Sequence, residues 1–227
     1  MKRSEINKII KNMERLIKKE GYKLPPFCNW SVSEWNAKGK EYQEIKDNML
    51  GWDITDFGLN NFKETGFALI TLRNGNQKDE KYTKPYAEKL LMLEDGQKAP
   101  MHFHWNKMED IINRGGGNVF IIVYNSTPEE GLGTDDVRVL SDGREYYVPA
   151  GTRIKLTPGM SITIYQGLYH AFEAEKGTGA VLLGEVSMCN DDTSDNRFYE
   201  PIGRFPDIEE DEEPYRLLCN EYPEALG

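Results

Sequence analysis

The sequence predicts a mainly β protein, in which an antiparallel sandwich or barrel follows one N-terminal helix. Three observations lead to this prediction. From Gly66 onward, short runs rich in β-branched and aromatic residues recur roughly every 8–12 residues, separated by Gly, Pro, Asn and Asp. No helix-length apolar period interrupts these runs, which argues against an alternating βαβ fold. Before them, residues 4–20 carry an apolar stripe with helical spacing.

The composition suits a single globular domain. The chain has 227 residues, of which 38% are hydrophobic and 29% charged. Its formal net charge of −10 argues against nucleic acid or an anionic membrane as partner, because both attract basic surfaces. No apolar run reaches membrane-spanning length and no signal-peptide pattern follows the basic first residues, so a cytoplasmic protein is expected. The three scattered cysteines, Cys28, Cys189 and Cys219, are expected to be reduced and structural.

Residues 4–20 are expected to form an amphipathic helix that packs on the main body or on a partner subunit. Ser4 can cap its start, and Gly21 can end it in the left-handed conformation. Pro25 and Pro26 then prevent its continuation, because proline lacks the backbone N–H that a helix needs.

The next segment, residues 27–64, is polar and rich in turns. Short helices are expected from Ser33 and near residues 41–48. Its aromatic side chains are expected to plug the side of the domain, and lining a polar ligand's pocket is the alternative. The aromatic residues concerned are Trp30, Trp35 and Trp52.

The segment from residue 66 to residue 190 is expected to form a β-barrel of short strands. The strands are predicted at residues 66–74, 89–94, 102–105, 109–112, 118–125, 137–140, 145–148, 152–157, 161–165, 170–174 and 180–187. Ser141-Asp142-Gly143 is a hairpin signal between two of them.

Residues 191–227 are expected to be a loop that closes with a short helix over Tyr215–Leu226. The acidic run Ile208–Glu213 is interpreted as solvated, with a calcium site as the weaker alternative. With residues 1–65 as a helical and loop elaboration packed on the barrel of residues 66–190, the whole chain is expected to form one structural domain.

The stretch Gly96–Gly117 holds the candidate functional residues. Alternate side chains of a strand point to one side, so His102 and His104 project into one space, and a turn can bring Glu109 beside them. His170, in a separate strand-like segment, is the natural fourth group. Imidazole nitrogens with a carboxylate oxygen suit a borderline divalent metal. For a bare H-x-H pattern, however, partly buried strand histidines without a metal are the favoured alternative.

These residues resemble the two motifs of the cupin superfamily. The first motif, G-x5-H-x-H-x3–4-E-x6-G, is matched at every fixed position, namely Gly96, His102, His104, Glu109 and Gly116. The second motif, G-x5-P-x-G-x2-H-x3-N, is matched at Gly159, Gly167 and His170, whereas Tyr165 replaces the proline and Ala174 the asparagine. These departures concern the shape of the turn more than metal ligation. The resemblance implies a cupin-type, jelly-roll-like β-barrel that carries a metal.

Longer stretches resemble the D-lyxose isomerases, which are cupin-type aldose–ketose isomerases. They are G-W-D-I-T-D-F-G at 51–58, T-L-R-N-G at 71–75, P-Y-A-E-K-L at 85–90, M-H-F-H-W-N-K-M-E-D-I-I-N-R-G-G-G at 101–117, Y-H-A-F at 169–172 and G-E-V-S-M-C-N-D-D-T-S-D-N-R-F at 184–198. The resemblance covers most of the chain and implies a homodimer that prefers Mn2+, with Zn2+, Co2+ or Fe2+ as other candidate ions. It implies as metal ligands His102, His104, Glu109 and His170.

Lys107 is the nearest candidate for a polar partner of the metal. If the strand of Glu109 begins by Lys107, the alternation of side chains puts both on the inward face. Desolvation beside a cation is expected to lower the pKa of this lysine. A solvent-exposed turn lysine is the favoured alternative on the sequence alone, but the family resemblance implies a catalytic role for Lys107.

The resemblance also implies a catalytic glutamate after the last long strand. Glu200 in R-F-Y-E-P is the best match, and Glu185 in G-E-V-S is the second. Lys84, Lys89 and Glu185 are the candidates for contacts with sugar hydroxyls, although Lys89 can also be a charge that protects a strand edge. Further polar candidates are Asp191, Asp192 and Arg204.

The expected function is a metal-dependent isomerase that interconverts D-lyxose and D-xylulose, and also D-mannose and D-fructose, through a cis-enediol. A cupin dioxygenase with the same three-His, one-Glu site and a non-catalytic sugar-binding cupin are the alternatives. Lys107, Glu200 and the tryptophan-rich segment favour the sugar enzyme, because a dioxygenase is expected to have a mainly apolar pocket. A metal-mediated hydride shift, which needs no protein base, stays open beside proton transfer.

Overall fold

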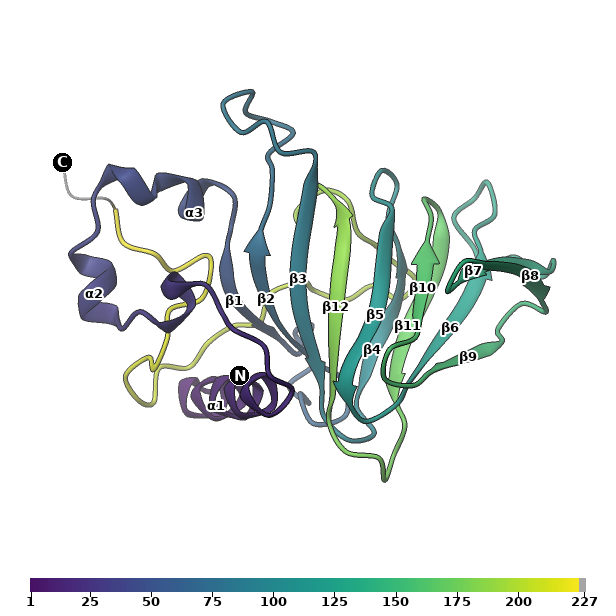
Figure 1. Cartoon of the computed structure of the whole chain (residues 1–227), viewed down its shortest axis with the longest axis horizontal. Coiled ribbons are helices and arrows are strands. Elements are labelled where there is room, and N and C mark those ends of the chain that lie inside the picture. Colours follow the sequence, from purple (N-terminus) through teal and green to yellow (C-terminus); the bar gives the residue numbers. More distant parts are fainter. Residues whose placement is uncertain (225–227) are drawn as a thin grey trace.

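The computed structural model describes residues 1–224 and has one long helix with four short ones. They are α1 (Arg3–Lys19), η1 (Pro26–Asn29), α2 (Val32–Asn36), η2 (Lys40–Tyr42) and α3 (Gln43–Asp47). The short helices predicted from Ser33 and near residues 41–48 are confirmed as α2 and as η2 with α3. In Figure 1 all of them lie at one end of the molecule, beside β1.

Residues 1–224 form thirteen strands, and every strand pairing is antiparallel. The strands are β1 (Gly51–Thr55), β2 (Phe67–Arg73), β3 (Tyr86–Leu93), β4 (Lys98–Phe103), β5 (Glu109–Gly116), β6 (Val119–Asn125), β7 (Val137–Ser141), β8 (Arg144–Val148), β9 (Arg153–Leu156), β10 (Ser161–Ile164), β11 (Leu168–Ala174), β12 (Val181–Met188) and β13 (Arg197–Phe198).

Two sheets enclose the main core. The larger sheet has the order β1-β2-β3-β12-β5-β10-β7-β8, and the smaller has the order β13-β4-β11-β6-β9. Buried side chains from both sheets meet in one apolar cluster, which includes Leu91, Ile111, Val123 and Phe172. The strands curve around this core, and the β7–β8 hairpin lies at the end opposite the helices (Figure 1). The mainly β, antiparallel architecture is therefore confirmed.

The alternation of side chains assigns one face of each central strand to the core. On β5, Glu109 and Ile111 are buried while Asp110 between them is exposed. The neighbouring strand β12 pairs Glu185 with Ile111 and turns Glu185 to the buried side as well. The larger sheet therefore brings polar residues, together with apolar ones, into the interior.

Helix α1 covers the outer face of the larger sheet. Its apolar stripe, which includes Ile6, Ile10 and Met13, is buried against a second cluster that contains Ile70 of β2 and Leu90 of β3. Burial of one stripe against a sheet is what stabilises an amphipathic helix of this length. The prediction that this helix packs on the main body is confirmed.

The two ends of α1 differ in how well the sequence predicts them. Gly21 has φ +78°, its N–H donates to the carbonyl of Lys18, and the N–H of Tyr22 donates to that of Ile17, so the left-handed stop is confirmed. The predicted cap at Ser4 is wrong. The helix begins one residue earlier, and the backbone N–H and hydroxyl of Ser4 both donate to the carboxylate of Asp211.

The acidic run at residues 208–213 is not simply solvated, because three of its carboxylates hold α1. Besides the Ser4 contact of Asp211, Glu210 accepts hydrogen bonds from the buried guanidinium of Arg3, and Glu212 accepts one from Asn7. The helix predicted over residues 215–226 is absent from 215–224, where the chain forms bends and turns. Residues 225 and 226 lie outside the described residues.

Strand β1 lies within the segment predicted to contain only helices and loops. It pairs with β2 along its whole length and extends the larger sheet, so the boundary at residue 65 does not separate a structural unit. All five residues of β1 are buried, and the apolar–polar alternation that marks a half-exposed strand is therefore missing.

The tryptophans of this segment pack as predicted, against the side of the domain. Trp52 is buried and donates its indole N–H to the carbonyl of Cys28. Trp35 is also buried and stacks on Tyr222, while Trp30 meets Trp35 edge-on. Within residues 1–224, no helix combines the length and the apolar composition that crossing a bilayer requires.

Candidate active site

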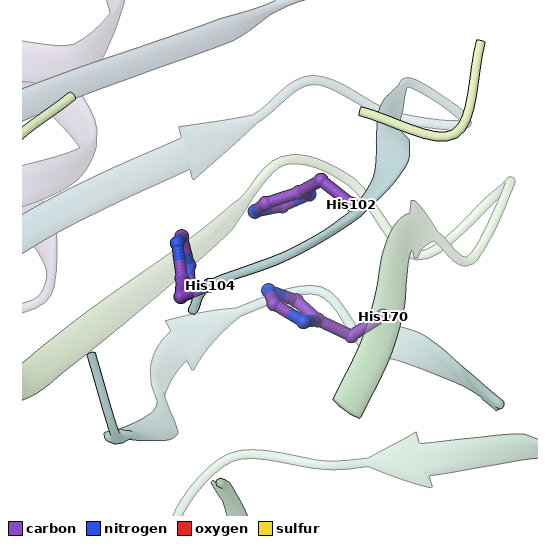
Figure 2. A group of neighbouring side chains, drawn as sticks. All are labelled: His102, His104 and His170. Carbon is purple, nitrogen blue, oxygen red and sulfur yellow. The ribbon is translucent and has the colours of Figure 1, made fainter. Parts of the chain in front are cut away.

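The three histidines of the chain meet inside the barrel (Figure 2). His102 lies on β4, His104 follows directly after that strand, and His170 lies opposite His102 on β11. Their imidazole rings lie close together, with centroid separations of 4.2 Å between His102 and His170 and 5.1 Å between His102 and His104. Strand alternation explains why both histidines of the H-x-H pattern point the same way.

Backbone carbonyls fix the tautomer of each ring. Nδ1 lies 2.9 Å from the carbonyl oxygen of Pro100 for His102, 2.7 Å from that of Asp195 for His104, and 3.0 Å from that of Leu168 for His170. Because a carbonyl oxygen only accepts, each Nδ1 carries the hydrogen and each Nε2 presents a lone pair. This second hydrogen bond is typical of metal-binding histidines.

The environment also keeps two of these rings neutral. Burial lowers the pKa of His102 well below its usual value, and the neighbouring imidazoles of His170 and His104 act in the same direction. Burial likewise lowers the pKa of His104, with a further contribution from the cation of Lys107. A neutral imidazole is the form that binds a metal.

Glu109 faces the histidines from the first residue of β5. Its Oε1 lies 3.2 Å from Nε2 of His170, and its Oε2 lies 3.6 Å from Nε2 of His104. Nε2 of His170 is buried and has no hydrogen-bond partner. A buried lone pair that faces a carboxylate is unfavourable unless a cation lies between them.

The donor set fits a divalent cation. One ring nitrogen from each of the three histidines lies within 4.8 Å of the others, and the carboxylate of Glu109 adjoins them. Three imidazole nitrogens with one carboxylate suit Mn2+, Fe2+, Co2+ or Zn2+ better than the all-oxygen sites that Ca2+ and Mg2+ prefer. The residues that could hold such an ion are therefore the four that the sequence predicts.

Lys107 joins this group, although it precedes β5 and does not belong to the strand. It is buried, and its Nζ lies 2.6 Å from Oε2 of Glu109 and 2.9 Å from Oε1 of Glu185. Burial alone would lower the pKa of Lys107, but the carboxylates of Glu109, Glu185 and Asp192 outweigh it and raise that pKa. These carboxylates therefore hold Lys107 as a cation, and the lowering of its pKa beside a bound metal ion stays a prediction.

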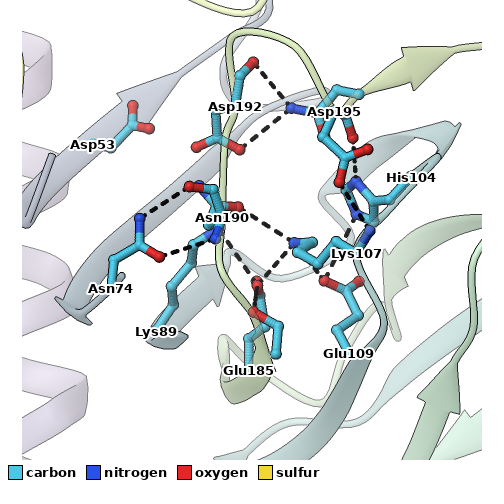
Figure 3. Close-up of polar contacts among 12 residues, drawn as sticks. Asp53, Asn74, Lys89, His104, Lys107, Glu109, Glu185, Asn190, Asp192 and Asp195 are labelled. Carbon is cyan, nitrogen blue, oxygen red and sulfur yellow. Dashed lines mark hydrogen bonds and ion pairs between the residues drawn. The ribbon is translucent and has the colours of Figure 1, made fainter. Parts of the chain in front are cut away.

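A second buried lysine, Lys89 on β3, contacts both Glu185 and Asn190. Its Nζ lies 3.4 Å from Oε1 of Glu185 and 2.5 Å from Oδ1 of Asn190. The loop after β12 adds Asp192, which is paired with Arg204 at 2.9 Å. Burial would raise the pKa of Asp192, but Lys89, Arg204 and Lys107 outweigh it and hold that pKa well below its usual range. Figure 3 shows this network with Lys107 at its centre.

Most of these side chains line one cavity inside the barrel. One part of its wall is apolar and aromatic, and includes Phe57, Phe67, Phe172 and Phe198. The polar part is formed by His102, His104, Lys107, Glu109, Lys89, Glu185, Asp192, Asn196 and Arg204. Such a wall can hold a small polyol by its hydroxyls and exclude water from its carbon chain.

Apart from His170, three sequence-predicted residues do not line this cavity. Asp191 forms an ion pair with Lys78 at 2.5 Å. Glu200 is exposed and lines a separate surface hollow with Pro100 and Met101. Lys84 forms an ion pair with Glu44 and its side chain is 39% exposed. The structure thus brings Glu185, and not Glu200, to Lys107.

Sequence reasoning missed three polar residues around the site, because nothing in their local pattern marks them. Asn190 contacts both lysines, Asp53 is paired with Arg204, and Asp195 bonds the turn after His104. The only available signal is an unusually polar loop directly after a long buried strand.

The comparisons with known proteins agree on one family. The model of the D-lyxose isomerase family matches residues 1–222. A D-lyxose/D-mannose isomerase from Escherichia coli O157:H7 is 46% identical, and one from Serratia proteamaculans is 45% identical, each over 98% of both chains. A D-lyxose ketol-isomerase from Cohnella laeviribosi is 31% identical over 70% of this chain and 82% of its own.

Solved structures share the fold at low sequence identity. The L-ribose isomerase of Cellulomonas parahominis is 15% identical with a TM-score of 0.61, over 91% of this chain and 98% of its own. That of Acinetobacter sp. DL28, solved with L-ribose, is 14% identical with a TM-score of 0.60 over the same shares. The cupin-type fold predicted from the motifs is confirmed. The chain belongs to the D-lyxose isomerase family and is an aldose–ketose isomerase.

Proposed function

We propose that this enzyme is a metal-dependent isomerase that interconverts D-lyxose with D-xylulose and D-mannose with D-fructose through a cis-enediol. One observation carries the proposal. His102, His104 and Glu109 line the same cavity as the buried pair of Lys107 and Glu185, and a ring nitrogen of His170 lies within 4.8 Å of those of the other two histidines. The relatives named D-lyxose/D-mannose isomerase support the choice of sugars.

In this proposal the metal is held by His102, His104, His170 and Glu109. A bound divalent ion, with Mn2+ as the preferred candidate, supplies Lewis-acid polarisation of the sugar's carbonyl group. The remaining chemistry belongs to the side chains around it.

Glu185 is the proposed base that moves a proton between C2 and C1 of the open-chain sugar. A carboxylate accepts a proton and can return it to the adjacent carbon, as general acid–base catalysis requires. Ser187, whose hydroxyl donates to Oε1 of Glu185 at 3.0 Å, and Lys107 orient this carboxylate. Glu200, the first match from the sequence, lies outside the cavity and is given no role.

Lys107 is the proposed hydrogen-bond donor to the oxygens of the enediol. Its raised pKa makes it a cation, so it suits stabilisation of developing negative charge rather than proton abstraction. Lys89, Asp192 and Arg204 line the rest of the polar wall and are proposed to contact the sugar hydroxyls. This charged lining favours a sugar isomerase, because a dioxygenase is expected to have a mainly apolar pocket. Lys84 pairs with Glu44 at the surface and does not line the cavity, so it is given no contact with the sugar.

The decisive experiment is isomerisation in D2O. The protein is loaded with Mn2+ and incubated with D-lyxose, and the product is analysed by NMR. We expect D-xylulose that carries deuterium at C1, the same exchange with D-mannose, and no turnover after chelation. Absence of ketose from either aldose would reject the proposed substrates, and full activity in the chelated protein would reject the metal. Ketose that lacks deuterium would favour a hydride shift or a shielded proton over an exchanging enediol.

We also infer that the protein is a homodimer, as its family resemblance implies. Support comes from three apolar side chains that are 41–47% exposed on the outer face of the larger sheet, namely Tyr86, Val186 and Met188. Tyr86 on β3 lies directly opposite Met188 on β12, so the side chains form one patch beyond the area that α1 covers. A second copy of the chain is the proposed occupant of this patch.

A further inference from the structure

We propose that Asp195 is a positioning residue, which orients the metal-binding His104 and the cationic Lys107 together. This inference rests on the proposed function, because it assigns a role in the same site. Asp195 lies in the loop between β12 and β13 and is 6% exposed. Figure 3 shows it directly above His104 and Lys107.

Three of its oxygens bind the turn that carries those two residues. The backbone carbonyl of Asp195 accepts from Nδ1 of His104 at 2.7 Å. Its carboxylate accepts from the backbone N–H of Asn106 at 2.8 Å through Oδ1, and from that of Lys107 at 2.9 Å through Oδ2. The Asn106 side-chain amide adds a longer bond of 3.2 Å. One residue therefore fixes the ring of His104 and the backbone of Lys107.

The turn at residues 104–108 has few other constraints. Strand β4 ends at Phe103 and β5 begins at Glu109, so the N–H groups of Asn106 and Lys107 have no strand partner. The carbonyl of His104 is bonded by the N–H of Gly167, and the carbonyl of Met108 by that of Met188. Between these two anchors the backbone is held by the carboxylate of Asp195, which accepts from two N–H groups, and by the side-chain amide of Gln166, which donates to the carbonyl of Asn106 at 3.0 Å. A reactive group displaced by about 1 Å loses much of its effect, so this control matters for catalysis.

The loop that holds Asp195 is itself anchored on both sides. The N–H of Asp195 donates to the carbonyl of Asp191, and two residues later Arg197 pairs with Phe103 at the end of β4. The loop is thus tied to the strand that carries His102. A displacement of Asp195 would therefore move two hydrogen-bond acceptors together, namely the carbonyl that bonds Nδ1 of His104 and the carboxylate that bonds the N–H of Lys107.

The test is Asp195→Asn, with Asp142→Asn as the matched control. Asn keeps the size of the side chain but turns an NH2 group toward one of the two backbone N–H donors. Asp142 is a loop aspartate that accepts from the backbone N–H and the hydroxyl of Ser161 through Oδ1 alone, and it lies in the β7–β8 hairpin outside the cavity. Calorimetric titration with Mn2+, the visible spectrum of the Co2+-loaded protein, kcat, KM and the thermal midpoint are measured for each.

We expect Asp195→Asn to weaken Mn2+ binding up to about 10–100-fold, because repulsion from a backbone N–H shifts residue 195 and with it the backbone carbonyl that bonds Nδ1 of His104. The Co2+ spectrum should change and kcat should fall, with a smaller change in KM, while Asp142→Asn matches the wild type in all of these. If Asp195→Asn does not fold, Asp195→Ser, which keeps an oxygen acceptor, replaces it. Native Mn2+ affinity with a native Co2+ spectrum would overturn the proposal. Wild-type protein that binds no Mn2+ would instead overturn the proposed function.

A double-mutant cycle tests the second half of the inference. If Asp195 acts on turnover partly through Lys107, then Asp195→Asn must cost less in kcat in the Lys107→Ala background than in the wild type. Equal fold losses in both backgrounds would show that Asp195 does not orient Lys107. Mn2+ affinity should fall by the same factor in both, since the His104 contact is independent of the lysine side chain.

Discussion

The two faces of the larger sheet are both buried in the middle of β3 and β12, but only the inner face carries charged side chains there. On β3, Lys89 is 3% exposed and points into the cavity, whereas its neighbour Leu90 is 1% exposed and packs beneath α1. The same contrast recurs on β12 between Glu185 and Leu182. Burial of charge costs free energy that pairing at best offsets, while apolar burial contributes stability directly. The outer face therefore stabilises the sheet on which the inner face positions its charges.

Among substitutions of residues that line the cavity, His104→Ala should have the largest effect. Loss of one ligand should abolish Mn2+ retention and lower kcat/KM by at least about a thousandfold, since a Lewis acid contributes several kcal/mol. Bound metal per chain and kcat/KM are the measurements. The thermal midpoint in chelator should stay near that of the chelated wild type. If the variant kept its metal, His104 would not be a ligand.

Lys107→Ala should separate metal binding from turnover. The four proposed ligands remain, so Mn2+ should bind, while kcat should fall by about 10²–10⁴-fold because the donor to the enediol oxygens is gone. Elemental analysis and steady-state kinetics test both parts. Lys84→Ala is the matched control and should leave kcat and KM unchanged, because Lys84 pairs with Glu44 at the surface. Full activity of Lys107→Ala would disprove its role.

The two candidate glutamates can be compared directly. Glu185→Gln keeps the shape of the side chain but removes the base, and should lower kcat about 100-fold or more with Mn2+ still bound. Glu200→Gln should behave like the wild type, because Glu200 is exposed outside the cavity. Loss of the proton exchange at C2 in D2O is the most direct readout. The opposite ranking of the two variants would restore the assignment of Glu200.

The outer face is tested by Ile10→Ala in α1. Ile10 is fully buried against the second apolar cluster, so the substitution should cost about 2–5 kcal/mol of unfolding free energy. Urea unfolding measures this cost, and kcat of the folded variant should be unchanged. Lys8→Ala on the exposed side of the same helix provides the control. A large fall in kcat at unchanged stability would show that the two faces are coupled.

The exposed apolar patch of Tyr86, Val186 and Met188 is tested last, because a substitution there should have the smallest effect on catalysis. Val186→Asp should convert the proposed dimer into a monomer, because it places a charge within the apolar patch. Light scattering measures the change in mass, and kcat per chain should stay within a small factor of the wild type. Tyr147→Asp, which alters a more exposed side chain on β8, should leave the mass unchanged. A monomeric wild type would remove the inference of a homodimer.

Local patterns predicted the half-exposed elements well. Alternation of buried and exposed residues marks β5, and the stripe of residues 4–20 marks α1, because each has one buried face and one exposed face. The H-x-H pattern placed His102 and His104 together for the same reason. Strand β1 escaped because it is buried on both faces, and Ser4 was assigned as a cap because its true partner, Asp211, lies about two hundred residues away in sequence.

The charged network was harder to predict than the metal site. Nothing local distinguishes Glu185 from Glu200, and only the position of Glu185 on the inward face of β12 brings it to Lys107. The carboxylates that raise the pKa of Lys107 come from different segments, so no local pattern predicts their combined effect. Asp195 left no sequence signal, since its role depends on a loop that returns to the β4–β5 turn.

The contacts between α1 and the acidic run also fix an order of events in folding. Arg3 lies in the first turn of α1, yet its partners Glu210 and Glu221 lie 207 and 218 positions later in the sequence. The helix can form before these partners are made, but its polar anchorage waits for them. Contacts of such long sequence separation are slow to form. The apolar stripe of α1 therefore needs protection from aggregation until its last partners arrive.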